Sequence, residues 1–151
     1  SNITFSNLAI LGANENLVSL SSSSNITFNS CDLKFAGKNA VNGVATTNFT
    51  LQNSLVEDSY NSGLFFQWQD LNMKILNNTF NRTYVFPGMG RNGDTNGNTI
   101  YMSETSDNGL VEHHKNIKSV YKGNNFNGNN TVVKNNMVDS LCFVKVDGHG
   151  I

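Results

Sequence analysis

A short phrase that recurs along the chain limits its fold more than any other feature of the sequence. The phrase places apolar residues two positions apart and ends on asparagine or a polar substitute, as in residues 73–77. Such alternation is typical of a β-strand with one buried face. The copies end at Asn7, Ser30, Asn53, Asn77, His114 and Asn135, which are 23, 23, 24, 37 and 21 residues apart.

These spacings predict a solenoid in which about 23 residues form each turn. One turn cannot bury its apolar face alone, whereas stacked turns share a continuous core. Equivalent asparagines would lie ~4.8 Å apart, and their amides would hydrogen-bond in a ladder. A ladder accounts for the 27 asparagines of the chain. The sequence therefore predicts an all-β solenoid of about six rungs, forming a single domain over residues 1–151.

The fifth copy of the phrase is the least regular. Glu112 stands where an apolar residue is expected, which leaves the register of this copy open by one residue. The neighbouring His113 and His114 would face opposite ways on a strand, so the pair alone does not make a metal site. We assign His114 to the ladder, because an imidazole donates and accepts hydrogen bonds as an amide does.

The longest gap between copies contains an insertion at about residues 84–107. Insertions in solenoids form loops, often on the binding face. We predict that Arg91 and Asp94 in this loop bind substrate, with Arg91 pairing to a carboxylate. Residues 94–98 offer side-chain oxygens at alternate positions, as calcium loops do, but lack the glycine and distant glutamate of an EF-hand. Calcium is the weaker alternative, and no other cofactor is indicated.

The most aromatic part of the chain is residues 63–68, with the sequence GLFFQW. Because Phe65 and Phe66 are adjacent, one faces the core of a regular strand and the other faces solvent. We predict that Phe66 and Trp68 form a platform on which a sugar ring stacks. The alternative is that these rings pack beneath a loop.

A second group of polar residues lies near the C-terminal end of the sequence. Lys145, Asp147 and His149 are two apart, so on a strand they share one face. An amine, a carboxylate and an imidazole together are suited to general acid–base catalysis. Lys145 could instead pair with the carboxylate of an acidic sugar. The alternative is a solvated outer strand face, and whether the chain is an enzyme stays open.

The recurring phrase resembles the right-handed parallel β-helix, or pectate-lyase-like, superfamily over nearly the whole chain. Residues 134–151, KNNMVDSLCFVKVDGHGI, are similar to a segment of secreted β-helix proteins from Bacteroidetes-type bacteria. The resemblance implies a secreted or cell-surface protein that binds or processes an acidic polysaccharide in a groove along one sheet. The triplet 148–150 is also similar to polygalacturonases, but the paired-aspartate motif of that family is missing from this sequence, so their activity is not inferred.

Composition narrows the possible partners. Charged residues make up 14% of the chain and the net charge is −1, which gives no electrostatic basis for binding nucleic acid. No apolar run approaches the ~18 residues that suggest a membrane span. Both ends fall inside repeat phrases, so we expect a piece of a longer solenoid that contacts the remaining rungs. The rival hypotheses are a structural or adhesive segment of a large surface protein, and a scaffold that displays loops to a protein partner.

Overall fold

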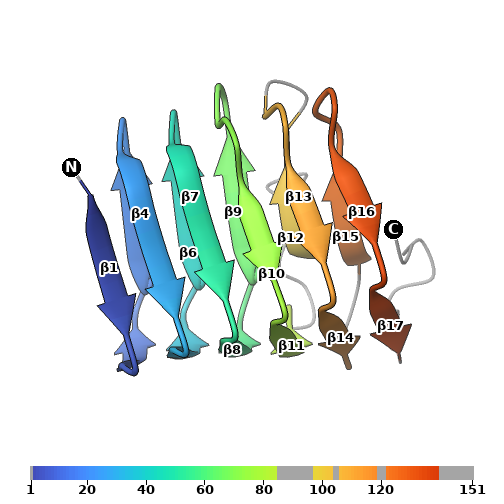
Figure 1. The fold of residues 1–151 in the computed structure, drawn as a ribbon. Helices are drawn as coiled ribbons and strands as arrows, with labels where there is room; N and C mark the ends of the chain where they lie inside the picture. The colour runs from blue at the N-terminus through green and yellow to red at the C-terminus, as the bar shows by residue number, and fades with distance from the viewer. Residues whose placement is uncertain (1, 85–96, 104–105, 119–121, 140–151) are drawn as a thin grey trace.

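The computed structural model describes residues 2–84, 97–103, 106–118 and 122–139. Within these ranges all regular structure is β-strand, and every strand pair is parallel. The strands form three sheets that wind about a shared core in about five turns, as Figure 1 shows. The predicted all-β solenoid is therefore confirmed. None of the described segments forms a helix that could cross a membrane.

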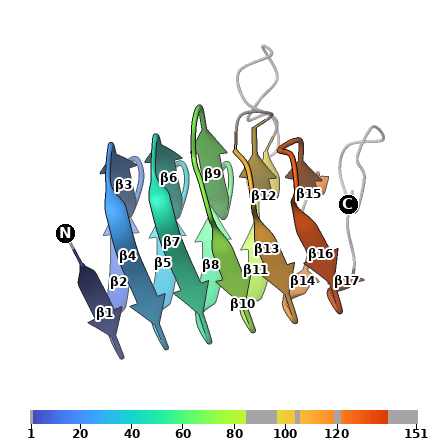
Figure 2. The ribbon, with the colours of Figure 1, turned by 45° about the horizontal axis from the view of Figure 1, so that its top comes forward.

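Each turn contributes one strand to each sheet, and the three sheets lie on different sides of the core (Figure 2). Sheet A contains β1 (Ile3–Ser6), β4 (Ser24–Asn29), β7 (Thr47–Gln52), β10 (Lys74–Leu76), β13 (Leu110–Glu112) and β16 (Val132–Lys134). Sheet B contains β2 (Ala9–Ala13), β5 (Asp32–Ala36), β8 (Leu55–Ser59), β11 (Thr79–Thr83), β14 (Lys115–Ile117) and β17 (Met137–Asp139). Sheet C contains β3 (Val18–Ser21), β6 (Val41–Val44), β9 (Leu64–Gln67), β12 (Asn98–Met102) and β15 (Lys122–Phe126).

The apolar residues of the repeated phrase form columns through the core. In sheet A, Phe5 pairs with Phe28 and Phe28 pairs with Leu51, so like positions stack from turn to turn. The rings of Phe5 and Phe28 are stacked with their centroids 4.8 Å apart. The apolar side chains at alternate positions of each strand thus stack into a buried column that runs across the strands. In this way stacked turns bury apolar side chains that a single turn would leave exposed.

The predicted asparagine ladder follows sheet A, with one correction. Its positions have left-handed backbones, which asparagine tolerates better than most residues, and they are Asn7, Ser30, Asn53, Asn77, His113 and Asn135. The ladder residue of the fifth turn is thus His113, and the assignment of His114 was wrong. Leu76 pairs with Glu112, so the charged side chain lies at an outward strand position and the next residue turns the corner. The Nδ2 of Asn77 donates to Oδ1 of Asn53 at 3.4 Å, whereas the Nδ2 of Asn53 donates at 2.9 Å to Oδ1 of Asn29, which precedes the ladder position.

The predicted insertion is narrower than residues 84–107. Residues 98–102 form β12, in which Ile100 pairs with Leu64 of the preceding turn. The extra residues of this turn therefore lie between Tyr84 and Asn98.

A second ladder lies at the N-terminal end of the strands of sheet A. Its members are exposed and have φ between 56° and 58°, and they are Asn25, Asn48, Asn72, Asn108 and Asn130. The Nδ2 of Asn48 donates to Oδ1 of Asn25 at 2.8 Å, and the Nδ2 of Asn72 donates to Oδ1 of Asn48 at 2.9 Å. Each amide in the middle of the ladder therefore both donates and accepts.

We expect Asn48→Ala to lower the free energy of unfolding by about 1–2 kcal/mol, because alanine disfavours the left-handed backbone and breaks both ladder bonds. Urea unfolding measures the effect. Asn48→Gly is the matched control, since glycine keeps the conformation and removes only the ladder bonds. A glycine variant as stable as the unchanged protein would show that the ladder bonds contribute nothing.

Candidate functional site

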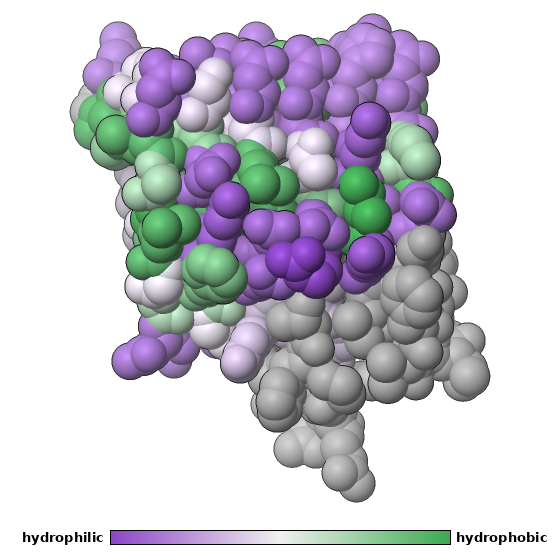
Figure 3. Space-filling view, turned by 90° about the horizontal axis from the view of Figure 1, so that it is seen from below, coloured by the Kyte–Doolittle hydropathy of each residue, from purple (hydrophilic) through white to green (hydrophobic). Residues whose placement is uncertain are grey.

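The outer face of sheet B carries the main cluster of charged side chains in the described residues. This charged network consists of Asp32, Lys34, Glu57, Asp58, Asn81 and Arg82. Parallel register places Lys34 of β5 beside Glu57 of β8, and Glu57 beside Asn81 of β11. The centre of the network is therefore formed by three residues at the same position of successive turns. In Figure 3, which views the molecule from this side, hydrophobic and hydrophilic residues are interspersed.

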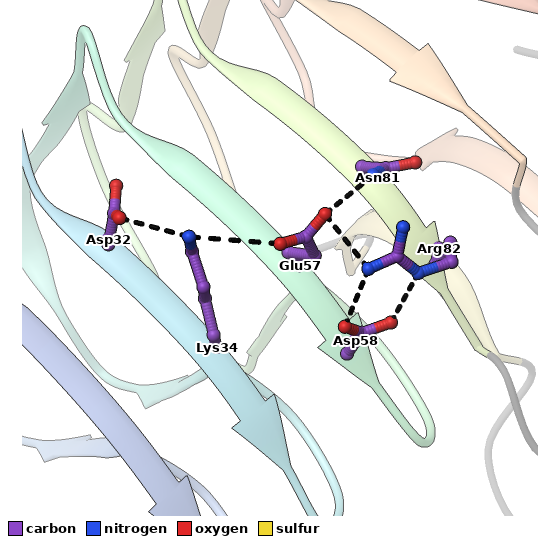
Figure 4. Close-up of polar contacts among 6 residues, drawn as sticks. All are labelled: Asp32, Lys34, Glu57, Asp58, Asn81 and Arg82. Carbon is purple, nitrogen blue, oxygen red and sulfur yellow. Dashed lines mark hydrogen bonds and ion pairs between the residues drawn. The ribbon is translucent and has the colours of Figure 1, made fainter.

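Arg82 joins two carboxylates, and the three side chains point toward one another in Figure 4. Its Nε and Nη2 donate to the two oxygens of Asp58 at 2.6 and 2.8 Å. Nη2 also lies 3.0 Å from Oε1 of Glu57. A bidentate pair of this kind fixes the plane of the carboxylate. Asp58 is thus presented in one orientation.

Lys34 is engaged by acidic partners in the same way. Its Nζ lies 3.0 Å from Asp32 and 3.8 Å from Glu57. Hydrogen bonds to Asp32 and Asp58, respectively, raise the pKa of Lys34 and that of Arg82 above their usual values. Both cations of the network therefore remain charged and are committed to carboxylates.

An aromatic pocket of about 360 Å³ adjoins the network where the strands of sheet B end. Ala13, Ala36 and Ser59 pair in register, so Asn14, Gly37 and Tyr60 follow one another across the next column. Gly37 has no side chain, and a Cβ there would lie 2.2 Å from the carbonyl oxygen of Asn14. Glycine therefore allows the close approach of the two backbones here, and Asn14, Gly37 and Tyr60 line the pocket from three successive turns.

Phe35 and Asp58 line the same pocket from the adjacent column. Phe35 is 55% exposed and Tyr60 is 46% exposed. Phe35 also has a φ of 64°, at the corner position that Gly12 occupies in the preceding turn with a φ of 72°. A left-handed backbone costs a bulky residue about 1–2 kcal/mol. Asp58 and Arg82 also have left-handed φ at this corner, so the conformation belongs to the fold, and what distinguishes Phe35 is an exposed aromatic ring at this position.

The structure places the predicted aromatic platform differently. Phe66 is fully buried, with its ring centroid 5.1 Å from that of Phe49, so its assignment to the surface is corrected. The ring lies over Gly43, where a Cβ would be 2.2 Å from it. The outward ring of the pair is Phe65, which stacks on Tyr101 at 4.9 Å. Trp68 is 63% exposed, as expected of a surface platform, and directly follows β9, whereas Phe66 is inside the core.

The remaining predicted site residues are Arg91, Asp94, Lys145, Asp147 and His149, and they lie outside the described residues. The two adjacent histidines face opposite ways as predicted, with His113 exposed and His114 buried. Across the described ranges, no three histidine, cysteine, aspartate or glutamate side chains are grouped to hold a metal ion.

Two ionisable side chains are buried in the solenoid wall rather than in the charged network. Burial raises the pKa of Asp70 to about 6, although hydrogen bonds from Thr46 and Ser106 oppose the rise. Burial lowers the pKa of His114 to about 4. Both effects follow from removing a charge from water. Neither side chain lines the pocket, so we assign both to structure.

Sequence reasoning missed Phe35 and Tyr60, which are the exposed rings of the pocket. A signal was present in the repeat alignment, because Phe35 aligns with Gly12, Asp58 and Arg82 at a corner. An aromatic residue at a position otherwise glycine or charged is unusual. Comparisons with protein-family models, curated proteins and solved structures found no match for this chain. Its possible function therefore rests on the geometry of this face.

Proposed function

We propose that this protein binds polysaccharide through the end of sheet B, with one sugar ring seated in the aromatic pocket. The observation that carries the proposal is the pairing of two exposed rings, Phe35 and Tyr60, with a carboxylate held in one orientation. Sugar rings have apolar faces that pack on aromatic side chains and hydroxyl groups that donate to carboxylates. Binding pockets generally combine apolar walls with a few oriented polar groups.

The charged network would extend this contact along the solenoid. Lys34, Glu57 and Asn81 lie on successive strands, so their polar groups recur at the strand spacing of ~4.8 Å. An extended chain of sugars has a monomer repeat of similar order. The proposal shares a polysaccharide ligand with what the resemblance to pectate-lyase-like proteins implies, and it agrees with a secreted or cell-surface protein. The catalytic roles of Lys145, Asp147 and His149 stay predictions from sequence.

The test is isothermal titration with a panel of neutral and acidic oligosaccharides. Tyr60→Ala should weaken binding about tenfold or more, because a central aromatic contact typically contributes over ~1 kcal/mol. Thr27→Ala on sheet A is the control and should leave affinity unchanged. Binding that survives loss of Tyr60 would place the glycan elsewhere on the molecule.

The second candidate is a structural or adhesive segment that takes no ligand. The exposed ladder favours it, because its amides satisfy one another from Asn25 to Asn130 without a partner. Absence of binding to every glycan in the panel would support this role over the first.

A further inference from the structure

We infer that the aromatic pocket accepts a neutral sugar ring and discriminates against uronic acids. The inference rests on the proposed glycan binding and specifies its substrate class. It runs against the acidic substrate that the sequence resemblance implies. Three features of the site carry it: the charges, the fixed acceptor and the exposed aromatic wall.

In the described part of the chain, both cations of the charged network are already paired with carboxylates. The network holds three carboxylates, from Asp32, Glu57 and Asp58, and two cations, from Lys34 and Arg82. Lys34 lies between Asp32 and Glu57, and Arg82 lies between Glu57 and Asp58. Both cations therefore contact Glu57. The five groups therefore sum to one negative charge. A uronate entering the pocket would meet this negative charge, and the two cations of the network are already engaged by its carboxylates.

Asp58 is the ionised side chain that lines the pocket, beside the amide of Asn14 and the hydroxyl of Tyr60, and as a carboxylate it only accepts. Each oxygen of Asp58 takes one N–H from Arg82, and a carboxylate oxygen has a further lone pair to offer. Sugar hydroxyls can donate to these positions. The carboxylate of a uronate adds no donor and would bring a like charge close to Asp58. Because Arg82 already holds the acceptor in place, little ordering is left for a ligand to impose, which favours binding of a hydroxylated ring.

The aromatic wall carries an exposed ring at a left-handed corner. Gly12 shows that glycine occupies this corner one turn earlier with a similar φ, yet the next turn carries Phe35 and leaves its ring exposed. An aromatic ring that is 55% exposed at this corner is suited to an apolar partner from outside the chain. The uncharged face of a pyranose is such a partner. An aromatic face also offers a uronate carboxylate no favourable charge.

The decisive experiment uses a matched pair of ligands on the unchanged protein. Oligogalacturonate and its fully methyl-esterified form have the same rings and differ in charge. Titration at low salt should give a Kd at least tenfold lower for the ester. The difference should shrink as salt screens the network. Neutral gluco-, manno- and chito-oligosaccharides extend the comparison and rank the neutral sugars.

The outcomes separate this inference from the proposed function. Equal or tighter binding of the free acid overturns the selectivity and leaves glycan binding standing. Failure of every glycan to bind overturns both. Asp58→Asn removes one negative charge, so it should narrow the preference for the ester at least threefold. An unchanged preference would show that the network does not set it.

Phe35→Gly tests the wall without threatening the fold. Glycine suits the left-handed corner, as Gly12 does, so thermal stability should be equal or higher. Affinity for the ester should nevertheless fall about tenfold. A variant that melts at the same temperature and binds as tightly would overturn the role of Phe35.

Discussion

Replacing Asp70 by asparagine should raise the free energy of unfolding at pH 8 by about 2–3 kcal/mol. Asp70 is fully buried at the corner between sheets C and A. Its Oδ1 accepts the backbone N–H of Thr46 at 2.8 Å, and its Oδ2 accepts the hydroxyl of Ser106 at 3.4 Å. No cation pairs with it among the residues described. Asparagine can accept from Thr46 through its Oδ1 and donate through its Nδ2 to the hydroxyl oxygen of Ser106, so it makes both contacts without burying a charge.

The gain should depend on pH in a defined direction. Burial raises the pKa of Asp70 from 3.8 to about 6, so the folded protein binds this proton more tightly than the unfolded chain does. The contribution of Asp70 to stability is fully present below pH ~4 and is lost as pH rises through about 6. The shift of about two units corresponds to ~3 kcal/mol. The advantage of Asp70→Asn should therefore disappear near pH 4.

Urea unfolding at pH 8 and pH 4 measures both parts of this prediction. Asp107→Asn is the matched control, because Asp107 also accepts a backbone N–H, from Asn129 at 2.7 Å, but is only partly buried. Its replacement should change stability little. If Asp70→Asn were no more stable than the unchanged protein at pH 8, the charge on Asp70 would have to be compensated within the fold.

The solenoid could be predicted because one physical requirement repeats in every turn. Apolar residues at alternate positions must face the core, and left-handed corners favour asparagine, so both leave a period in the sequence. The period led to a wrong ladder residue only in the fifth turn, where Glu112 is at an outward strand position and the corner comes one residue earlier than predicted. The second ladder has the same period as the first and precedes it by five residues, from Asn25 and Ser30 onward.

The candidate site was less predictable because it depends on contacts between turns. Which of Phe65 and Phe66 faces inward is decided by Gly43 in the neighbouring turn, and both strand faces there are aromatic. The pocket likewise depends on Gly37 lying between Asn14 and Tyr60. The alternation of one strand contains neither fact. Both facts follow from the register between neighbouring turns. The repeat alignment gives this register only when equivalent positions are compared over the whole length of every turn.

His114 should make the protein sensitive to acid, and its contribution should be about 3 kcal/mol. The ring is almost fully buried and packs edge-on to Phe80, with centroids 5.6 Å apart. The amide of Asn124 accepts from Asn116 through Oδ1 at 2.9 Å, which turns its Nδ2 toward Nε2 of His114 at 3.2 Å. Nε2 is then the acceptor, so the neutral ring carries its proton on Nδ1. Protonation of Nε2 would bury a positive charge. It would also place two N–H donors against each other, one on Nε2 and the other on Nδ2 of Asn124.

The direction with pH is opposite to that of Asp70. Burial lowers the pKa of His114 from 6.5 to about 4, so the unfolded chain binds this proton more tightly. Stability from neutral His114 is present above pH ~6.5 and is lost as pH falls toward 4. Asp70 gains a stabilising proton over much of the same range, so the two effects largely offset each other in the unchanged protein. Asp70→Asn removes the offset, and its free energy of unfolding should fall by about 3 kcal/mol between pH 7 and pH 4.

His114→Asn in the Asp70→Asn background should abolish most of that fall, because Asn78 occupies the equivalent position one turn earlier without a titrating group. His113→Asn in the same background is the control, since His113 is the exposed neighbour and should leave the acid-induced loss of stability in place. Urea unfolding at several pH values distinguishes the variants. Equal losses in the His113 and His114 variants would mean that acid acts elsewhere on the solenoid. If only the proteins that retain His114 lose stability in acid, then protonation of His114 causes the loss. The fifth turn would then be acid-sensitive because it carries a buried imidazole where the preceding turn carries the amide of Asn78.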